Sequence, residues 1–414
     1  MINLKGNIYT ACSILSNFIL YFILLRIVGV SAFADAFFYQ QTFVNFLSLS
    51  PMLIWKALPN YIFFLNKNVD INKLALNCYL RQFLFAFILS IIVILLFSFL
   101  EIQPSLTRKI LIYNIWLCIP LASNSFISVF INLKGNYHIS FIIDSVQYTL
   151  TAILCIIMMR IEWGVIYSFQ IGIVVSSLIY IYYAYKYRLF SYRKICANIE
   201  LKDIVKSSIK LSLSEQLYGM RLIIFSSFLL YLNEGSNSIF SYAIKISSAL
   251  LAVSNGPHVR KFVTDINILY ATDYTKEKVQ ILVKQLQKPV IILYTLLFFF
   301  SLLFLIIGQS YIKDIIKMNL TNYYTFTITL VLLCLGNYVI IAETPFSKIM
   351  HSKKEYNKYM FINTLYIALL SGICYFLITN SIDNLLYYVL LGLIVPQIIN
   401  CSLYKYYATR SKRL

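Results

Sequence analysis

The chain has 414 residues, of which 60% are hydrophobic and only 12% are charged, and it carries a formal net charge of +19. A soluble domain has about 25% charged residues. These values therefore argue against a soluble enzyme, a coiled coil and a disordered chain. At about 20 apolar residues per spanning helix, the length allows about twelve spans. The composition predicts an all-α polytopic membrane protein.

Twelve apolar segments follow one another along the chain and are the predicted transmembrane helices. Each segment is a continuous apolar run, whereas β-barrel strands would alternate over about ten residues. Backbone groups in lipid must pair within their own segment, which favours helices. The predicted spans are 7–28, 34–56, 79–100, 110–132, 138–159, 163–185, 210–232, 237–259, 288–308, 321–344, 358–379 and 384–404.

Lysine and arginine are distributed unequally between the connections on the two faces. With the N-terminus placed in the cytoplasm, 26 of the 35 Lys and Arg residues fall in inside segments and 6 fall at outside ends. Cytoplasmic connections carry the positive excess in membrane proteins. We therefore predict that both termini are cytoplasmic. The charge at that face is expected to attract anionic lipid headgroups, and nucleic acid is not an expected partner.

The longest inside connection, 186–209, lies at the midpoint of the chain and suggests two halves. An offset of 206 residues places Gly29 on Gly235, and it also aligns Ser48 with Ser254 and Pro51 with Pro257. We predict two six-helix bundles around a central cavity, 1–200 and 201–414, inserted in the same orientation and related by an axis along the membrane normal.

Motifs of soluble chemistry are missing from the sequence. It contains no HExxH, GxSxG or Walker motif. The eight cysteines are isolated, mostly within apolar runs, and the three histidines lie near predicted helix ends. Isolated cysteines of this kind are small apolar core residues. We therefore expect no catalytic residue, no metal site and no cofactor.

Ionisable residues inside the spans are the main candidates for function. A charge at the bilayer centre costs about 2.5–3.5 kcal/mol, so it faces a cavity or a partner. A structural ion pair is the alternative for each of them. Glu343 precedes Pro345 and is either a proton-exchanging group or the counter-ion of a lysine. The candidate cavity cations are Arg221, Lys245, Lys56 and Arg26, and the candidate cavity or ion-coupling acids are Asp35, Asp144, Glu215 and Glu343.

Two spans carry polar side chains at helical spacing. Gln41, Asn45 and Ser48 share one face of the second span with Lys56, and Ser241 and Ser248 share one face of the eighth with Lys245. These stripes are either the wall of a water-filled cavity or the source of hydrogen bonds between helices. Cations at such a wall suit an anionic substrate such as a pyrophosphate.

The layout resembles the polysaccharide-transporter branch of the MOP exporter superfamily, and the nearest group is the O-antigen (Wzx-type) flippases. LRIVGVSAFADAF over 25–37 resembles the family's turn between spans 1 and 2. SLSEQLYGMR over 212–221 and SIFSYAIKIS over 238–247 resemble its span 7–8 region, in which Arg221 and Lys245 match the family pattern. The chain departs from that pattern in having only 12 glycines.

The resemblance implies a flippase of the bacterial inner membrane. It would move undecaprenyl-pyrophosphate-linked oligosaccharide from the cytoplasmic to the periplasmic leaflet by alternating access, coupled to H⁺ or Na⁺. Membrane lipids and other polysaccharide-assembly membrane proteins are further expected partners. Arg221 and Lys245 are then the candidates for contact with pyrophosphate or acidic sugars.

Three alternatives remain open from the sequence. An O-antigen polymerase is similar in hydropathy, but it usually carries a long periplasmic loop, and the longest outside connection here is 309–320. A multidrug or cation antiporter of the same superfamily would favour carboxylates in the N-terminal half, where Asp35 and Asp144 lie. A membrane-embedded channel or scaffold is the third.

Overall fold

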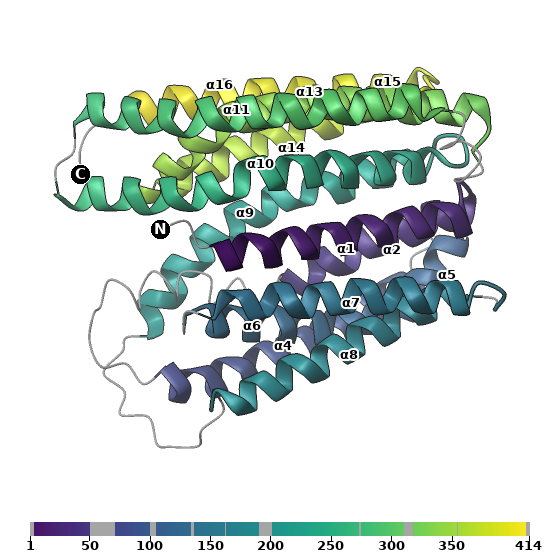
Figure 1. The fold of residues 1–414 in the computed structure, drawn as a ribbon, viewed down its shortest axis with the longest axis horizontal. Coiled ribbons are helices and arrows are strands. Elements are labelled where there is room, and N and C mark those ends of the chain that lie inside the picture. The colour runs from purple at the N-terminus through teal and green to yellow at the C-terminus, as the bar shows by residue number, and fades with distance from the viewer. Residues whose placement is uncertain are drawn as a thin grey trace. The chain divides into compact units, whose positions relative to one another are not determined.

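The computed structural model of the chain describes residues 4–49, 71–99, 105–133, 136–161, 163–189, 201–272, 275–309, 318–353 and 355–410. All regular structure in these ranges is helical (Figure 1). In the first part of the chain, the helices are α1 (Leu4–Val28), α2 (Ala32–Leu49), α4 (Ile71–Phe99), α5 (Ser105–Asn114), η2 (Ile115–Leu117), α6 (Cys118–Leu133), α7 (Tyr137–Ile157) and α8 (Gly164–Lys186).

The second part of the chain contains the longer helices. They are α9 (Leu201–Leu229), α10 (Ser236–Thr272), α11 (Lys276–Ile307), α13 (Leu320–Ser352), α14 (Tyr356–Thr379), α15 (Leu385–Tyr387), η3 (Tyr388–Ile394) and α16 (Val395–Arg410). Seven residues in η3 have π-helical geometry. A π-helix is rare in proteins, and many of the known examples lie at functional sites.

Nine membrane-crossing candidates stand out by length and composition in the described part of the chain. Every predicted span overlaps at least one observed helix. The nine candidates leave out α2, α9 and α10. These three helices include the two with the predicted polar stripes and the one with Glu215 and Arg221. The all-helical membrane class is confirmed, while the number twelve stays a prediction.

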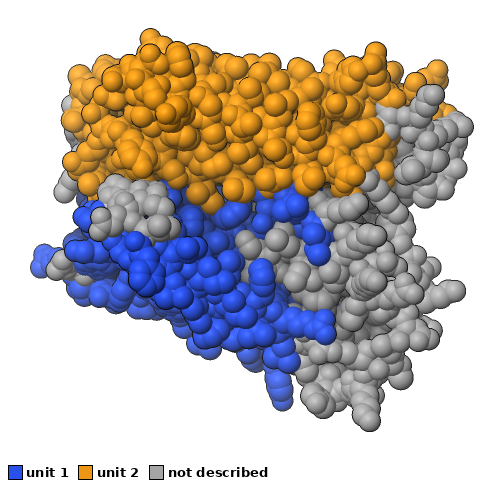
Figure 2. Space-filling view, turned by 180° about the vertical axis from the view of Figure 1, so that it is seen from behind, with its two compact units in different colours: residues 1–28, 36–216 blue, residues 29–35, 217–414 orange. Residues whose placement is uncertain are grey.

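The chain forms two compact units, which Figure 2 shows in different colours. Unit 1 comprises Met1–Val28 and Ala36–Gln216, and unit 2 comprises Gly29–Asp35 and Leu217–Leu414. The predicted division after residue 200 falls in 190–200, outside the described residues, and it stays a prediction.

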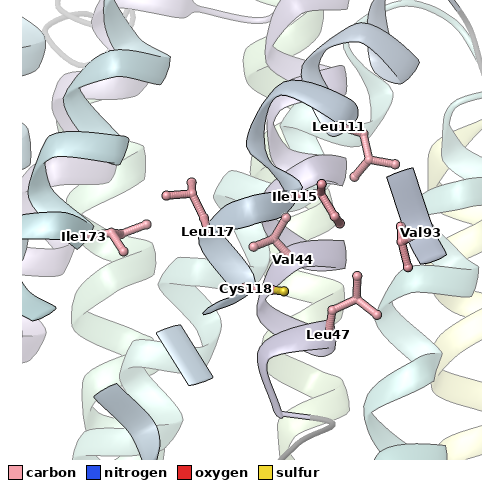
Figure 3. Close-up of a cluster of buried hydrophobic side chains, with 8 residues drawn as sticks. All are labelled: Val44, Leu47, Val93, Leu111, Ile115, Leu117, Cys118 and Ile173. Atoms are coloured by element: carbon pink, nitrogen blue, oxygen red, sulfur yellow. The ribbon is translucent and has the colours of Figure 1, made fainter. Parts of the chain in front are cut away.

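The interior of unit 1 is built from side chains of α2, α4, the α5–η2–α6 segment and α8. Helix α1 packs along α7, and α7 packs along α8, where Gly172 allows the close approach of Thr151. Lipid tails are as apolar as leucine, so van der Waals packing rather than water exclusion holds such a cluster together. The buried cluster in Figure 3 contains Val44, Leu47, Val93, Leu111, Ile115, Leu117, Cys118 and Ile173.

Unit 2 is organised around α13, which packs against α10, α11 and α16. The buried amide of Asn337 on α13 joins three of these helices. Its Nδ2 lies 3.0 Å from the carbonyl oxygen of Ser247 on α10 and 3.0 Å from the hydroxyl of Tyr294 on α11. In an apolar surrounding each such polar group needs a partner, so this amide fixes the register of α10 and α11 against α13.

The two glycines aligned by the offset share a backbone conformation. Gly29, between α1 and α2, has φ +66°, and Gly235, between α9 and α10, has φ +92°. Positive φ is a conformation that glycine adopts without steric cost. A positive φ therefore occurs at both glycines that the offset aligns.

Candidate functional site

The carboxylate of Asp35 caps the beginning of α10. Its Oδ2 accepts a hydrogen bond from the backbone N of Gly235 at 2.7 Å, and its Oδ1 accepts one from the backbone N of Ser238 at 2.6 Å. The first amides of a helix have no partner within the helix, and they favour a negative charge. The Asp35 side chain is only 7% exposed. Its two hydrogen bonds therefore hold it at the beginning of α10 within unit 2.

The turn before α10 caps α2 in return. The carboxylate of Glu234 accepts a hydrogen bond from the backbone N of Ala32 at 2.9 Å, in the first turn of α2. The side chain of Asn237 donates to the backbone carbonyl of Asp35 at 2.8 Å. Residues 29–35 are thus attached to unit 2 by reciprocal helix caps.

A second group of polar residues lies in the interior of unit 2. Arg221 on α9 donates from Nη1 to Oε1 of Gln397 on α16 at 3.0 Å. Nε2 of the same Gln397 donates to Oε2 of Glu343 on α13. One amide therefore connects a guanidinium and a carboxylate from two other helices. We call Arg221, Gln397 and Glu343 the charge relay.

Aromatic side chains surround the charge relay. The guanidinium carbon of Arg221 lies 3.8 Å from the ring centroid of Tyr218. Tyr366 on α14 interacts electrostatically with both Arg221 and Glu343. A cation over an aromatic face is stabilised by the ring quadrupole. Arg221 is thus held in position from two sides.

The backbone next to the charge relay is irregular on two helices. Pro345 lies inside α13 two residues after Glu343. Pro396 lies just after the π-helix η3 and next to Gln397. A proline removes a backbone donor and releases a carbonyl of the preceding turn. These irregularities concentrate backbone polarity in the interior of unit 2.

Unit 1 has a polar group of its own on α1, α2, α7 and α8. The hydroxyl of Tyr180 lies 3.5 Å from Oδ1 of Asp144, and the hydroxyl of Tyr21 donates to Oε1 of Gln41 at 3.3 Å. Tyr148 interacts electrostatically with Asp144, Tyr21 and Tyr180. Gln41 therefore takes part in hydrogen bonding between helices.

The other predicted site residues are spread over both units. Arg26 and Asn45 are exposed in unit 1, Ser248 is exposed on α10, and Lys245 and Glu215 are partly buried. Two serines are buried, and Oγ of Ser48 donates to the carbonyl of Asn45 within its own helix at 2.7 Å, while Ser241 is 5% exposed. Lys56 lies outside the described residues. In the polar stripe on α2, Asn45 is thus exposed, and the hydroxyl of Ser48 is hydrogen-bonded within its own helix.

Gln397 is the functional candidate that the sequence reasoning missed. Its amide is uncharged, so it was not among the ionisable candidates, and it lies 176 residues from Arg221. The neighbouring Pro396 within a predicted span was the available signal. The described residues contain no group of three or more His, Cys, Asp or Glu side chains that could hold a metal ion.

Sequence comparisons find no relative of the chain. No family model matches it. No curated protein matches it either.

Solved structures do match over nearly the whole chain. An inward-facing multidrug resistance MATE family transporter of the MOP superfamily matches with a TM-score of 0.70 and 14% identity, over 97% of this chain and 94% of that one. The lipid II flippase MurJ in an inward closed conformation matches with a TM-score of 0.71 and 14% identity, over 98% and 87%.

A MOP superfamily transporter from Pyrococcus furiosus, described as having a binding pocket of reversed polarity, has a TM-score of 0.68 and 12% identity over 98% and 94% of the two chains. All three matching structures are described as transporters or flippases. The chain has the fold of MOP-superfamily transporters.

Proposed function

We propose that the chain is a flippase for an undecaprenyl-pyrophosphate-linked oligosaccharide, the repeat unit of an O-antigen. The observation that carries this proposal is the guanidinium of Arg221 inside unit 2, in a fold shared with a lipid II flippase. A guanidinium binds phosphate oxygens through two parallel hydrogen bonds. A neutral or cationic drug would gain nothing from that geometry.

The transport cycle we propose is alternating access between the two halves, driven by H⁺ or Na⁺. The headgroup is taken up at the cytoplasmic leaflet and released at the periplasmic leaflet of a bacterial inner membrane. Lys245 on α10 adds a second intramembrane cation in unit 2. Two cations match the charge of a pyrophosphate, while the lipid tail stays in the bilayer. Both chain termini are placed in the cytoplasm.

A cation antiporter is the second candidate function, and one observation favours it. Asp144 in unit 1 has the hydroxyl of Tyr180 as its hydrogen-bond partner, at 3.5 Å. A carboxylate with such a neutral partner can bind an organic cation. This candidate predicts a change in resistance to cationic drugs on deletion, with surface polysaccharide unchanged.

The test is deletion and complementation in the native bacterium, with lipid-linked intermediates measured in each leaflet. We expect deletion to leave complete single repeat units in the cytoplasmic leaflet and the chain to restore surface polymer. Single units that reach the periplasmic leaflet without polymerising would contradict the flippase and identify a polymerase.

Two variants connect the phenotype to the proposed site. Arg221→Ala and Lys245→Ala should each lower surface polymer at least tenfold at normal protein level, because a lost charged contact costs about 1.5–3 kcal/mol. Lys284→Ala is the matched control, since Lys284 is an exposed lysine on α11. Wild-type polymer in both site variants would remove these residues from the binding site.

A further inference from the structure

Gln397 separates the two opposite charges of the charge relay. Its Oε1 accepts a hydrogen bond from Nη1 of Arg221 at 3.0 Å, and its Nε2 donates one to the carboxylate of Glu343. Within the described residues, no direct ion pair joins Arg221 to Glu343, although each acts on the other electrostatically. The Gln397 side chain is only 4% exposed. Its amide is therefore a buried spacer between the guanidinium and the carboxylate.

A direct pair between these charges would occupy the guanidinium. Carboxylate and phosphate oxygens both bind a guanidinium through two parallel hydrogen bonds. An intramembrane charge requires a partner, so without the amide Arg221 would bind the carboxylate of Glu343. A headgroup phosphate would then have to displace that carboxylate, and its binding would be weaker.

The spacer leaves N–H groups of Arg221 available. Besides Gln397, the side-chain partners of the guanidinium are Tyr366 and Tyr218, whose ring centroid lies 3.8 Å from the guanidinium carbon. A guanidinium has more N–H donors than these three partners require. None of the three is a carboxylate, so none competes with an anion for the guanidinium as Glu343 would.

The backbone before Gln397 brings this part of the chain close to the helix that carries Arg221. Gly392 lies in the π-helix η3, shortly before Gln397. A Cβ at Gly392 would lie 2.8 Å from Sγ of Cys374 on α14 and 3.4 Å from Cε2 of Phe225 on α9. A glycine permits such a close approach between helices. Phe225 follows Arg221 by about one turn, so this packing supports the bond between Arg221 and Gln397.

We propose that Gln397 is the positioning residue of the headgroup site, because it holds the guanidinium of Arg221 away from Glu343 and keeps it available to the pyrophosphate. The inference rests on the proposed function, in which Arg221 binds that headgroup. Gln397 acts through the placement of Arg221. Glu343 is the second anchor of the amide: a carboxylate accepts only from the NH₂ end, which turns the amide oxygen towards the guanidinium.

Removal of the amide should weaken binding although both charges remain. The experiment measures the binding of undecaprenyl pyrophosphate to purified full-length protein in detergent at a fixed pH. Gln397→Met keeps an unbranched side chain of similar length and allows Arg221 to bind Glu343 directly. Its affinity should fall by about tenfold or more, because the hydrogen bonds of the guanidinium are then made to the carboxylate.

A second substitution should restore the binding that the first removes. When Gln397→Met is combined with Glu343→Gln, no carboxylate captures Arg221, and affinity should return to within about threefold of Glu343→Gln alone. Glu343→Gln alone should bind at least as tightly as the wild type, because its amide oxygen still accepts from Gln397 and its negative charge no longer repels the headgroup. A merely structural role of Gln397 would not be rescued by a change at Glu343.

Gln287→Met is the matched control. Nε2 of Gln287 on α11 donates to the carbonyl oxygen of Ala342 on α13 at 3.2 Å, so this change removes an amide next to Glu343 without releasing a charge. The control should bind the probe as the wild type does. If Gln397→Met does not fold, Gln397→Leu takes its place, with the same expected loss and the same rescue.

Unfolding measurements without ligand test the new ion pair separately. The coupling between Arg221 and Glu343 is obtained from the unfolding equilibrium constants of Arg221→Gln, Glu343→Gln and the protein with both changes. Expressed as a ratio of these constants, the coupling should be about tenfold larger in the Gln397→Met background than with Gln397 present, because the two charges are then in direct contact.

The two measurements separate the inference from the proposed function. Wild-type affinity in folded Gln397→Met, or a loss that Glu343→Gln does not rescue, would overturn the positioning role while the flippase proposal stands. A coupling that Gln397→Met leaves unchanged would also overturn it. If the coupling rises but the wild type does not bind undecaprenyl pyrophosphate, the separation of the two charges stands, and pyrophosphate as the ligand is wrong.

Discussion

Replacing Asp35 with alanine should destabilise the protein more than such a small change in the side chain suggests. The change removes the carboxylate that receives hydrogen bonds from Gly235 N at 2.7 Å and Ser238 N at 2.6 Å. A hydrogen bond to a charged group contributes about 1.5–3 kcal/mol. We take the lower value for both bonds, because the two share one carboxylate, and expect a loss of about 3 kcal/mol.

Asn at the same position tests the charge and geometry of the cap. Asp35→Asn keeps one acceptor oxygen but places an NH₂ group against a backbone N–H. Two donors then face each other at a site with 7% exposure. An unmatched buried donor costs about 1–3 kcal/mol, so Asp35→Asn should lose nearly as much stability as Asp35→Ala.

The assay is the free energy of unfolding of purified protein in mixed detergent micelles, combined with hydrogen exchange of residues 235–240. Glu234→Ala is the matched control, because its carboxylate caps α2 through one exposed hydrogen bond to Ala32 at 2.9 Å. That variant should lose less than about 1 kcal/mol. If Asp35→Ala unfolds within about 0.5 kcal/mol of wild type, with unchanged exchange, the capping argument fails.

Three further predictions concern packing and topology. Gly235→Ala should lower the free energy of unfolding by about 3 kcal/mol, because φ is +92° and the added Cβ would lie 2.2 Å from Cγ1 of Val30. Gly29→Ala should lower it by only about 1–2 kcal/mol, because nothing lies within 4 Å of the added Cβ. Equal losses for the two variants in an unfolding assay would contradict this reasoning. Asn337→Ala loses hydrogen bonds to two helices and should cost about 1–2 kcal/mol, measured the same way, with an unchanged unfolding midpoint as the refuting result. A fluorescent reporter fused after Leu414 should fold and fluoresce, while an alkaline phosphatase fusion there should be inactive; the opposite pair of results would place the C-terminus outside.

The sequence was sufficient for the all-helical membrane class and for the presence of a helix at each predicted span, while α9, α10, α11 and α13 extend beyond the predicted bounds. In lipid, each spanning segment must satisfy its own backbone groups, so a local apolar run is enough to indicate a helix. The offset of 206 residues also paired Gly29 with Gly235, and both adopt positive φ. That agreement follows because a left-handed turn restricts the residue type locally.

The partners of the intramembrane charges were decided only by the tertiary structure. Asp35 finds its partners 200 residues away in the backbone of another turn, and Arg221 finds Gln397 at a separation of 176 residues. A charge pattern indicates that a partner is required, but backbone amides and an uncharged glutamine do not appear in a charge pattern. Helix packing selects them, because the partner of a buried charge is whichever polar group the neighbouring helices bring within hydrogen-bond distance.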